Sequence, residues 1–67
     1  MQQLEAKLHE LFGKDPKVQG LTAKVHVDEL NMDDFHNLYK IGMIYNTKSI
    51  IAKRSGTGIT ILFTLKN

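Results

Sequence analysis

Cysteine is absent from this chain of 67 residues, and two common ways of stabilising a small fold are absent with it. Neither a disulfide nor a thiolate metal site can form. A chain of this length buries only about 60% of the surface that its unfolded form exposes, so its core must be thin. Small folds without such links depend on close packing or on self-association. We therefore expect a single domain over residues 1–67, which a homodimer would help to stabilise.

Long apolar runs are absent too. The longest, ITILFTL, is far too short to cross a bilayer. Glu5 and Glu10 interrupt the N-terminal segment, where a secretory signal needs an unbroken apolar run. The lack of cysteine is compatible with a reducing compartment. We expect a cytoplasmic protein without a membrane partner.

Residues suited to catalysis are few. The only serines, Ser49 and Ser55, lack the sequence context of an activated nucleophile, which needs a base within hydrogen-bonding reach. The three histidines, His9, His26 and His36, fall in three separate predicted elements, and their separations match no compact metal-ligand spacing. We therefore expect no catalytic residues, no metal site and no cofactor.

Two further motifs are explained without a ligand. The acidic group Asp28, Glu29, Asp33 and Asp34 lacks the glycine and the terminal glutamate of a calcium-binding loop. Acids in the first turn of a helix are favoured by the helix dipole. The GTG segment at 56–58 lacks the lysine and hydroxyl residue that follow the last glycine of a nucleotide phosphate loop. These residues predict a helix start and a hairpin turn.

Acidic residues are missing from the second half of the chain. All seven lie in residues 1–34, where four lysines leave a net charge of −3. Residues 35–67 carry four lysines, one arginine and no acid, a net charge of +5. Unpaired cations gathered on one surface attract phosphates. The alternative is that the acidic half folds against the basic half and neutralises it.

The first half begins with a helix and continues into a strand. Apolar residues at helical spacing share one face up to Gly13, which ends the helix: Leu4, Leu8, Leu11 and Phe12. The segment KDPKVQG predicts a loop, because a residue before proline avoids helical backbone angles. TAKVHV alternates apolar and polar residues, which is typical of a half-buried strand.

A second helix is expected over residues 31–41. Asn31 is a good N-cap, and Asp33 and Asp34 follow it where the helix dipole favours negative charge. Leu30 and Phe35 can pack together as a hydrophobic staple.

The spacing of Phe35, Leu38 and Tyr39 predicts the buried face of this helix. We expect Gly42 to end the helix in a left-handed conformation, with Met43 in contact with Leu38.

Residues 47–55 fit two interpretations. As a strand, they pair with residues 59–65 through the RSGTG turn, and the second strand turns Ile59, Ile61, Phe63 and Leu65 toward the core. As a helix, they begin at Asn46 or Thr47 and end at Gly56. Two adjacent β-branched residues and a glycine-rich turn favour the hairpin.

The elements then predict a small α+β domain of order α-β-α-β-β, with a three-stranded antiparallel sheet and two helices on one face. The helical alternative for 47–55 gives an order that resembles a winged helix. The GMIYNT connection is longer than a tight helix-turn-helix turn, and the first wing strand is missing from that pattern.

The leading functional hypothesis is a non-enzymatic nucleic-acid-binding regulator or accessory protein. If 47–55 is a strand, its cations and hydroxyls gather near one end of the hairpin, beside backbone amides, as a phosphate-contacting set. With a single arginine, we expect contacts to the phosphate backbone rather than strong base readout. The predicted contact residues are Lys48, Lys53, Arg54, Lys40 and Lys66.

The alternative hypothesis is a protein-interaction module, such as a small inhibitor or adaptor. Such a protein needs no catalytic residues and can bind through a sheet edge or an apolar helix face. On the outer face of the last strand, Leu62 with Ile51 beside it predicts a small apolar patch. Tyr39 and Tyr45 are candidates for stacking on bases if they are exposed.

Overall fold

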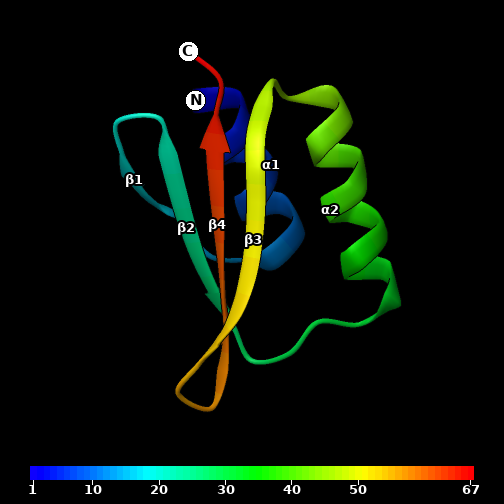
Figure 1. The fold of residues 1–67 in the computed structure, drawn as a ribbon. Coiled ribbons are helices and arrows are strands. Elements are labelled where there is room, and N and C mark those ends of the chain that lie inside the picture. Colours follow the sequence, from blue (N-terminus) through cyan, green and yellow to red (C-terminus); the bar gives the residue numbers. More distant parts are fainter.

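The computed structural model describes all 67 residues as two helices and four strands (Figure 1). In chain order the elements are α1 (Gln2–Phe12), β1 (Lys17–Gln19), β2 (Thr22–Val27), α2 (Met32–Ile44), β3 (Thr47–Ser55) and β4 (Gly58–Leu65). The strands form one sheet of order β1-β2-β4-β3, and every neighbouring pair is antiparallel. The fold is therefore α+β, as predicted, with the order α-β-β-α-β-β.

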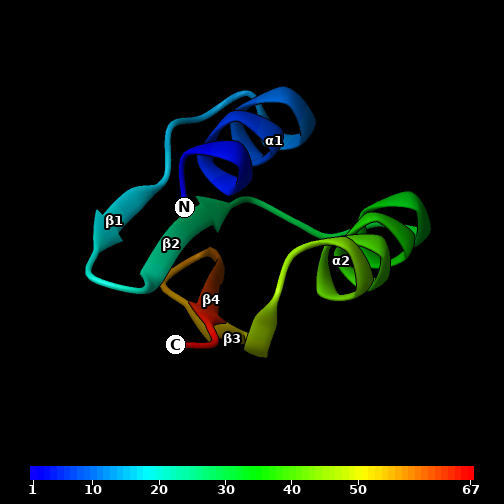
Figure 2. The ribbon, with the colours of Figure 1, turned by 90° about the horizontal axis from the view of Figure 1, so that it is seen from above.

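Both helices lie on the same side of the sheet, α1 over β2 and α2 beside β3 (Figure 2). Successive side chains of β2 and β4 point to opposite sides of the sheet, and the buried apolar ones point toward the helices. The core they form contains nine buried side chains: Leu4, Leu8, Ala23, Val25, Val27, Leu38, Ile41, Ile61 and Phe63. The opposite side of the sheet carries no helix, and we call it the open face. Neither helix is long and apolar enough to span a membrane.

The sheet has four strands rather than the expected three. The missed strand is β1, which lies in the segment predicted to be a loop and pairs with β2 through a turn at Gly20 and Leu21. Its three residues are all exposed and show no apolar alternation. Pairing with β2, rather than burial, makes this segment a strand. Gly20 permits the tight turn because its φ of 60° lies in the left-handed region.

The hairpin interpretation of residues 47–55 is confirmed, and the winged-helix alternative is wrong. Ser55 pairs with Gly58 across a two-residue turn, and Gly56 takes a φ of 64°. On β4, Ile61 and Phe63 are fully buried, while Ile59 and Leu65 are half-buried against the core, as the alternation predicts.

The predicted end of the first helix and the predicted start of the second are confirmed. Gly13 ends α1 with a φ of 69°. Asn31 caps α2, and its side chain accepts a hydrogen bond of 2.8 Å from the backbone of Asp34. The Asp34 carboxylate accepts one of 3.0 Å from the Asn31 backbone in return. This reciprocal capping box satisfies two backbone donors that would otherwise lack partners.

We expect Asn31→Ala to lower the free energy of unfolding by about 1 kcal/mol, because it removes the side-chain oxygen that accepts the hydrogen bond from the Asp34 backbone. Urea denaturation followed by circular dichroism measures the change. His36→Ala, an exposed change on the same helix, is the control and should leave the midpoint within about 0.5 kcal/mol of the wild type. Equal effects of the two changes would contradict the role given to the cap.

The buried face of α2 differs from the predicted one. Leu38 and Ile41 are buried, whereas Phe35 and Tyr39 are 53% and 68% exposed. Ile41 shares the inward face with Leu38 because the two residues are three apart along the helix. The predicted burial is therefore confirmed for Leu38 and wrong for Phe35 and Tyr39.

Gly42 lies inside α2 rather than at its end, and Tyr45 is the C-cap. A Cβ built on Gly42 would lie 3.5 Å from Ile50 Cδ1 and 3.7 Å from Thr47 Oγ1. The Thr47 hydroxyl also donates a hydrogen bond of 3.2 Å to the Gly42 carbonyl. Both distances are ordinary van der Waals contacts, so the packing of α2 on β3 at this point does not require a glycine. The predicted left-handed end of the helix at Gly42 is therefore wrong, and Met43, within the same helix, is 71% exposed.

Candidate nucleic-acid interface

The open face is formed by alternate residues of all four strands. Side chains that are directly opposite in an antiparallel sheet point to the same side, so the strand register gives three rows across it. The rows are Gln19–Thr22–Thr64–Ser49, then Lys17–Lys24–Leu62–Ile51, then His26–Thr60–Lys53. None of these positions is acidic. Figure 1 views the sheet from this side, with α1 behind it.

Two lysines face each other in the middle row. Lys17 of β1 lies directly opposite Lys24 of β2. Directly opposed side chains have Cβ atoms about 5 Å apart, and like charges in that position destabilise the pair. Neither ammonium group has a carboxylate partner within 4 Å. Neither lysine therefore forms an ion pair within the chain, although the Asp15 carboxylate lines the same hollow as both.

A shallow hollow connects Lys24 with Lys53. It has a volume of about 380 Å³, and its walls include Lys24 from β2, Thr60 and Leu62 from β4, and Lys53 from β3. Strands are spaced about 4.8 Å apart, and Lys24 and Lys53 are two strands and two residues away from each other. Their attachment points are therefore roughly 12 Å apart.

A second hollow, of about 340 Å³, lies on the other side of Lys24. Lys14 and Lys17 also line it, and the Lys14 Nζ donates a hydrogen bond of 3.1 Å to the His26 carbonyl. The ring of His26 is held against β4, with Nδ1 3.2 Å from Thr60 Oγ1. One carboxylate, that of Asp15, borders this hollow.

The acidic half does not fold over the basic half through ion pairs. The two ion pairs of the chain join Lys7 to Glu10 at 3.6 Å and the His9 ring to Asp15 at 2.8 Å. Both are formed within the first half of the sequence. No lysine or arginine of residues 35–67 has a carboxylate within 4 Å.

The structure separates the five predicted contact residues. Lys53 lies on the open face, and Arg54, the next residue along β3, points to the other side of the sheet. Lys48 lies at the far end of β3, about 17 Å of strand away from Lys53, beside the C-terminal part of α2. Lys66 follows β4 near Asn46, and Lys40 is exposed on α2. The expected cluster at one end of the hairpin does not form.

Lys14, Lys17 and Lys24 were not among the predicted contact residues. They belong to the half whose net charge is negative, and net charge hides where each side chain points. One signal was present: the alternation in TAKVHV places Lys24 on the polar side of its strand. The pairing of β2 with β4, which brings Lys24 near Lys53, joins residues far apart in the chain and had no local signal.

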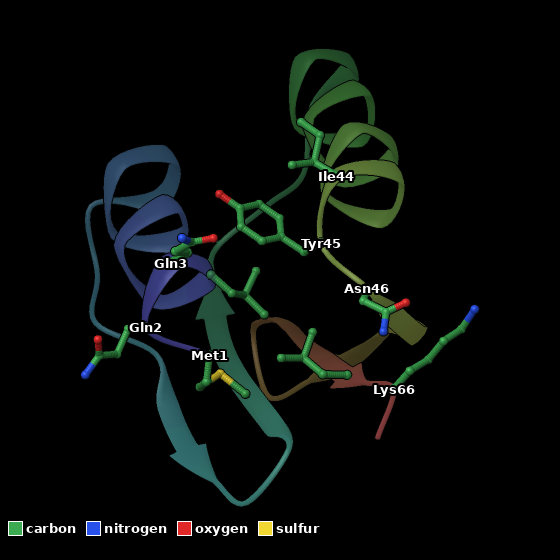
Figure 3. A pocket seen from close by; sticks show the side chains of 9 residues that line it. Met1, Gln2, Gln3, Ile44, Tyr45, Asn46 and Lys66 are labelled. Carbon is green, nitrogen blue, oxygen red and sulfur yellow. The ribbon is translucent and has the colours of Figure 1, made fainter.

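The open face carries no aromatic side chain. Tyr39 is exposed, but on α2 behind the sheet, and Tyr45 lines a hollow between the two helices (Figure 3). Apart from the imidazole of His26, this surface therefore offers no aromatic ring on which unpaired bases could stack. The lysines, His26 and the threonine and serine hydroxyls are groups that bind phosphate oxygens.

The hollow in Figure 3 has a volume of about 600 Å³ and lies between the start of α1, the end of α2 and the end of β4. Lys66 is the one charged side chain in its wall, and no nucleophile is placed beside a base there. No group of three or more histidine or acidic side chains lies close enough to hold a metal ion. The open face, with its lysines, His26 and hydroxyl side chains, is therefore the candidate functional site.

No protein-family model, no curated protein and no solved structure matches this chain.

Proposed function

We propose that this chain is a non-enzymatic nucleic-acid-binding protein that contacts the phosphate backbone with the open face of its sheet. Lys17, Lys24 and Lys53 are the central contacts, and Lys14 and His26 lie at the border. The proposed contact site is the face of the sheet and not the end of the hairpin, where the sequence predicted it. Arg54, Lys48, Lys40 and Lys66 become peripheral.

The observation that carries the proposal is the opposed pair of Lys17 and Lys24. Two ammonium groups side by side without a carboxylate destabilise a sheet. Such an arrangement is tolerated best where an external anion completes it, and a phosphate backbone supplies closely spaced negative charges. Lys53 extends the same acid-free surface across β4 to β3.

The expected target is a duplex bound with modest sequence preference. The lack of aromatic side chains on the open face argues against a single-stranded mode based on stacking. Specific recognition of guanine most often uses arginine, and the single arginine of the chain points away from this face. Contacts to phosphates position a protein on the helix without reading its sequence.

Fluorescence anisotropy with labelled duplex and single-stranded probes tests the proposal. We expect binding at about 50 mM salt that weakens steeply toward about 200 mM, as counterion release requires. The duplex should bind at least as tightly as the single strand of equal length. A protein that binds neither probe even at the lower salt concentration is not a nucleic-acid-binding protein of this kind.

We expect the salt dependence of duplex affinity to change only when the replaced lysine lies on the open face, although every such replacement changes the net charge equally. Lys24→Gln and Lys7→Gln each remove one positive charge, but Lys7 lies on α1, behind the sheet. We expect Lys24→Gln to reduce the slope of log affinity against log salt by about 0.9, the value for one lost contact on B-DNA. Lys7→Gln should leave the slope unchanged, and equal slopes for the two variants would contradict the assignment.

The second candidate function is a protein-interaction module, such as an inhibitor or adaptor. It is favoured by the apolar pair on the open face, where Ile51 is 52% exposed and lies directly opposite Leu62. A single stoichiometric protein partner that remains bound after nuclease treatment, and is lost in Ile51→Ser, would support this function over the first. A partner that nuclease treatment removes would support nucleic-acid binding.

A further inference from the structure

One face of α2 is apolar and has no partner within the chain. Its residues are spaced by three or four, which places them in a single stripe along the helix. We call them the α2 stripe: Met32, Phe35, Tyr39 and Met43, with exposed fractions of 81%, 53%, 68% and 71%. The helix buries its other side through Leu38 and Ile41. The stripe is therefore a second apolar face that packing in the monomer does not use.

The stripe is large for an isolated chain of this size. With roughly 200 Å² for each large side chain, these fractions correspond to roughly 500–600 Å² of exposed surface. The largest apolar patch on a typical monomer is about 300–600 Å². Each partner in a standard interface contributes about 800 Å², and about 65% of a homodimer interface is apolar. The stripe supplies close to that apolar share.

The stripe continues toward the free edge of the sheet. A hollow of about 490 Å³ lies between α2 and β3, and Tyr39, Met43 and Ile50 are in its wall. The strand β3 is at the edge of the sheet, so it has unpaired backbone groups beside this hollow. A partner that covers the stripe can therefore extend its contact onto β3.

Charges beside the stripe are arranged so that the surface complements itself. Asp33 and Lys40 are exposed and are separated by seven residues, or two helical turns, so they lie on the same flank of α2. Neither takes part in an ion pair within the chain. If two copies of α2 pack antiparallel around a two-fold axis, the same flanks meet, and Asp33 of each copy faces Lys40 of the other. In a parallel pair the two charged flanks would lie on opposite sides of the interface, and neither contact would form.

We infer that the α2 stripe binds a second copy of this chain, as an antiparallel pair of α2 helices related by a two-fold axis. Met32 of each copy packs near Met43 of the other, and the rings of Phe35 and Tyr39 interdigitate at the centre. Two reciprocal Asp33–Lys40 contacts fix the direction. Because α2 lies behind the sheet, both open faces remain exposed in this dimer.

Sedimentation equilibrium of the protein alone, without nucleic acid, tests this inference. We expect a concentration-dependent dimer with a dissociation constant in the micromolar range or below. Tyr39→Glu should weaken the dimer by roughly 30-fold or more, the effect of a central contact residue. Ile51→Glu is the matched control, because it places the same charge at an exposed apolar position on the open face, and it should leave the dimer intact. Circular dichroism verifies that both variants are folded.

A charge exchange tests the antiparallel direction. Asp33→Lys and Lys40→Asp each bring like charges together in their own homodimer, so each variant alone should dimerise at least tenfold more weakly than the wild type. Mixed in equal amounts, they restore both opposite-charge contacts. The mixture should form a heterodimer with an affinity within about threefold of the wild type.

Three outcomes would overturn the inference. The first is a wild-type protein that stays monomeric up to about 1 mM. The second is a dimer that Ile51→Glu weakens as much as Tyr39→Glu does, because the interface would then be elsewhere. The third is a mixture of the two charge variants that stays monomeric while the wild type dimerises, because the helices would then not pair in the proposed direction.

Discussion

Gly58→Ala should remove most of the folding stability of this protein. A Cβ on Gly58 would overlap the backbone carbonyl oxygen of Val27 and would lie 2.7 Å from the His26 ring nitrogen Nε2. The His26 side chain can rotate away, but the carbonyl belongs to the backbone of β2, which pairs with β4. We expect a loss of about 3 kcal/mol or more from a domain of this size, whose total stability is about 3–10 kcal/mol.

Gly56→Ala is the control, because its loss of stability comes from an unfavourable backbone conformation and not from a steric clash. No atom lies within 4 Å of a Cβ built on Gly56, but its φ of 64° is unfavourable for alanine. The expected cost is about 1–2 kcal/mol, and it comes from backbone conformation alone. Urea denaturation of both variants measures the two losses. A smaller loss for Gly58→Ala than for Gly56→Ala would contradict the close approach of β4 to β2.

Removing the three central lysines of the open face should have the largest effect on function. If each contacts one phosphate, the triple variant Lys17→Gln, Lys24→Gln and Lys53→Gln loses three contacts. The slope of log affinity against log salt should then fall by about 2.7 on B-DNA. Because these side chains are exposed and unpaired, the free energy of unfolding should stay the same or rise, since a repulsive pair is removed.

A second triple variant separates position from net charge. Lys7→Gln, Lys40→Gln and Lys48→Gln remove the same total charge from the helix side of the sheet. We expect the salt slope to change by less than about 1. Because Lys40 lies in the inferred dimer interface, both variants should be compared at a concentration where sedimentation shows the same oligomeric state. Equal slope losses for the two variants would point to long-range attraction by net charge and contradict a defined face.

The elements with strong local signals were predictable from the sequence. A glycine at a helix end, a polar N-cap followed by acids, and a glycine turn between alternating strands each act within a few residues. These signals predicted α1, the start of α2 and the β3–β4 hairpin. The strand β1 had no such signal, because only its pairing with β2 makes it a strand.

The face that α2 buries was not predictable from its own spacing. Two apolar stripes share this helix, one through Leu38 and Ile41 and one through Phe35 and Tyr39, and either satisfies the helical period. Packing of α2 against β3 decides between them. A helix with two apolar faces is itself a signal that one of them is available to a partner.

The residues of the candidate site could not be predicted from local sequence either, because strand pairing between distant parts of the chain brings them together. The excess of positive charge in residues 35–67 indicated the kind of partner, but alternation along β3 separates Lys53 from Arg54. The sheet order then places Lys24 of the first half on the same hollow as Lys53 of the second, with β4 between them. Neither effect can be read from charge counted along the chain.

The most direct measurement of the central claim is a titration of the ¹⁵N-labelled protein with a short DNA duplex, followed by the amide resonances. We expect the largest shifts at low salt in the strands of the open face, around Lys17, Lys24, Lys53 and Thr60, and their disappearance as salt is raised. Amides of α1 should not move. Shifts confined to α2, or no shifts at all at a duplex concentration well above that of the protein, would contradict phosphate binding by the open face.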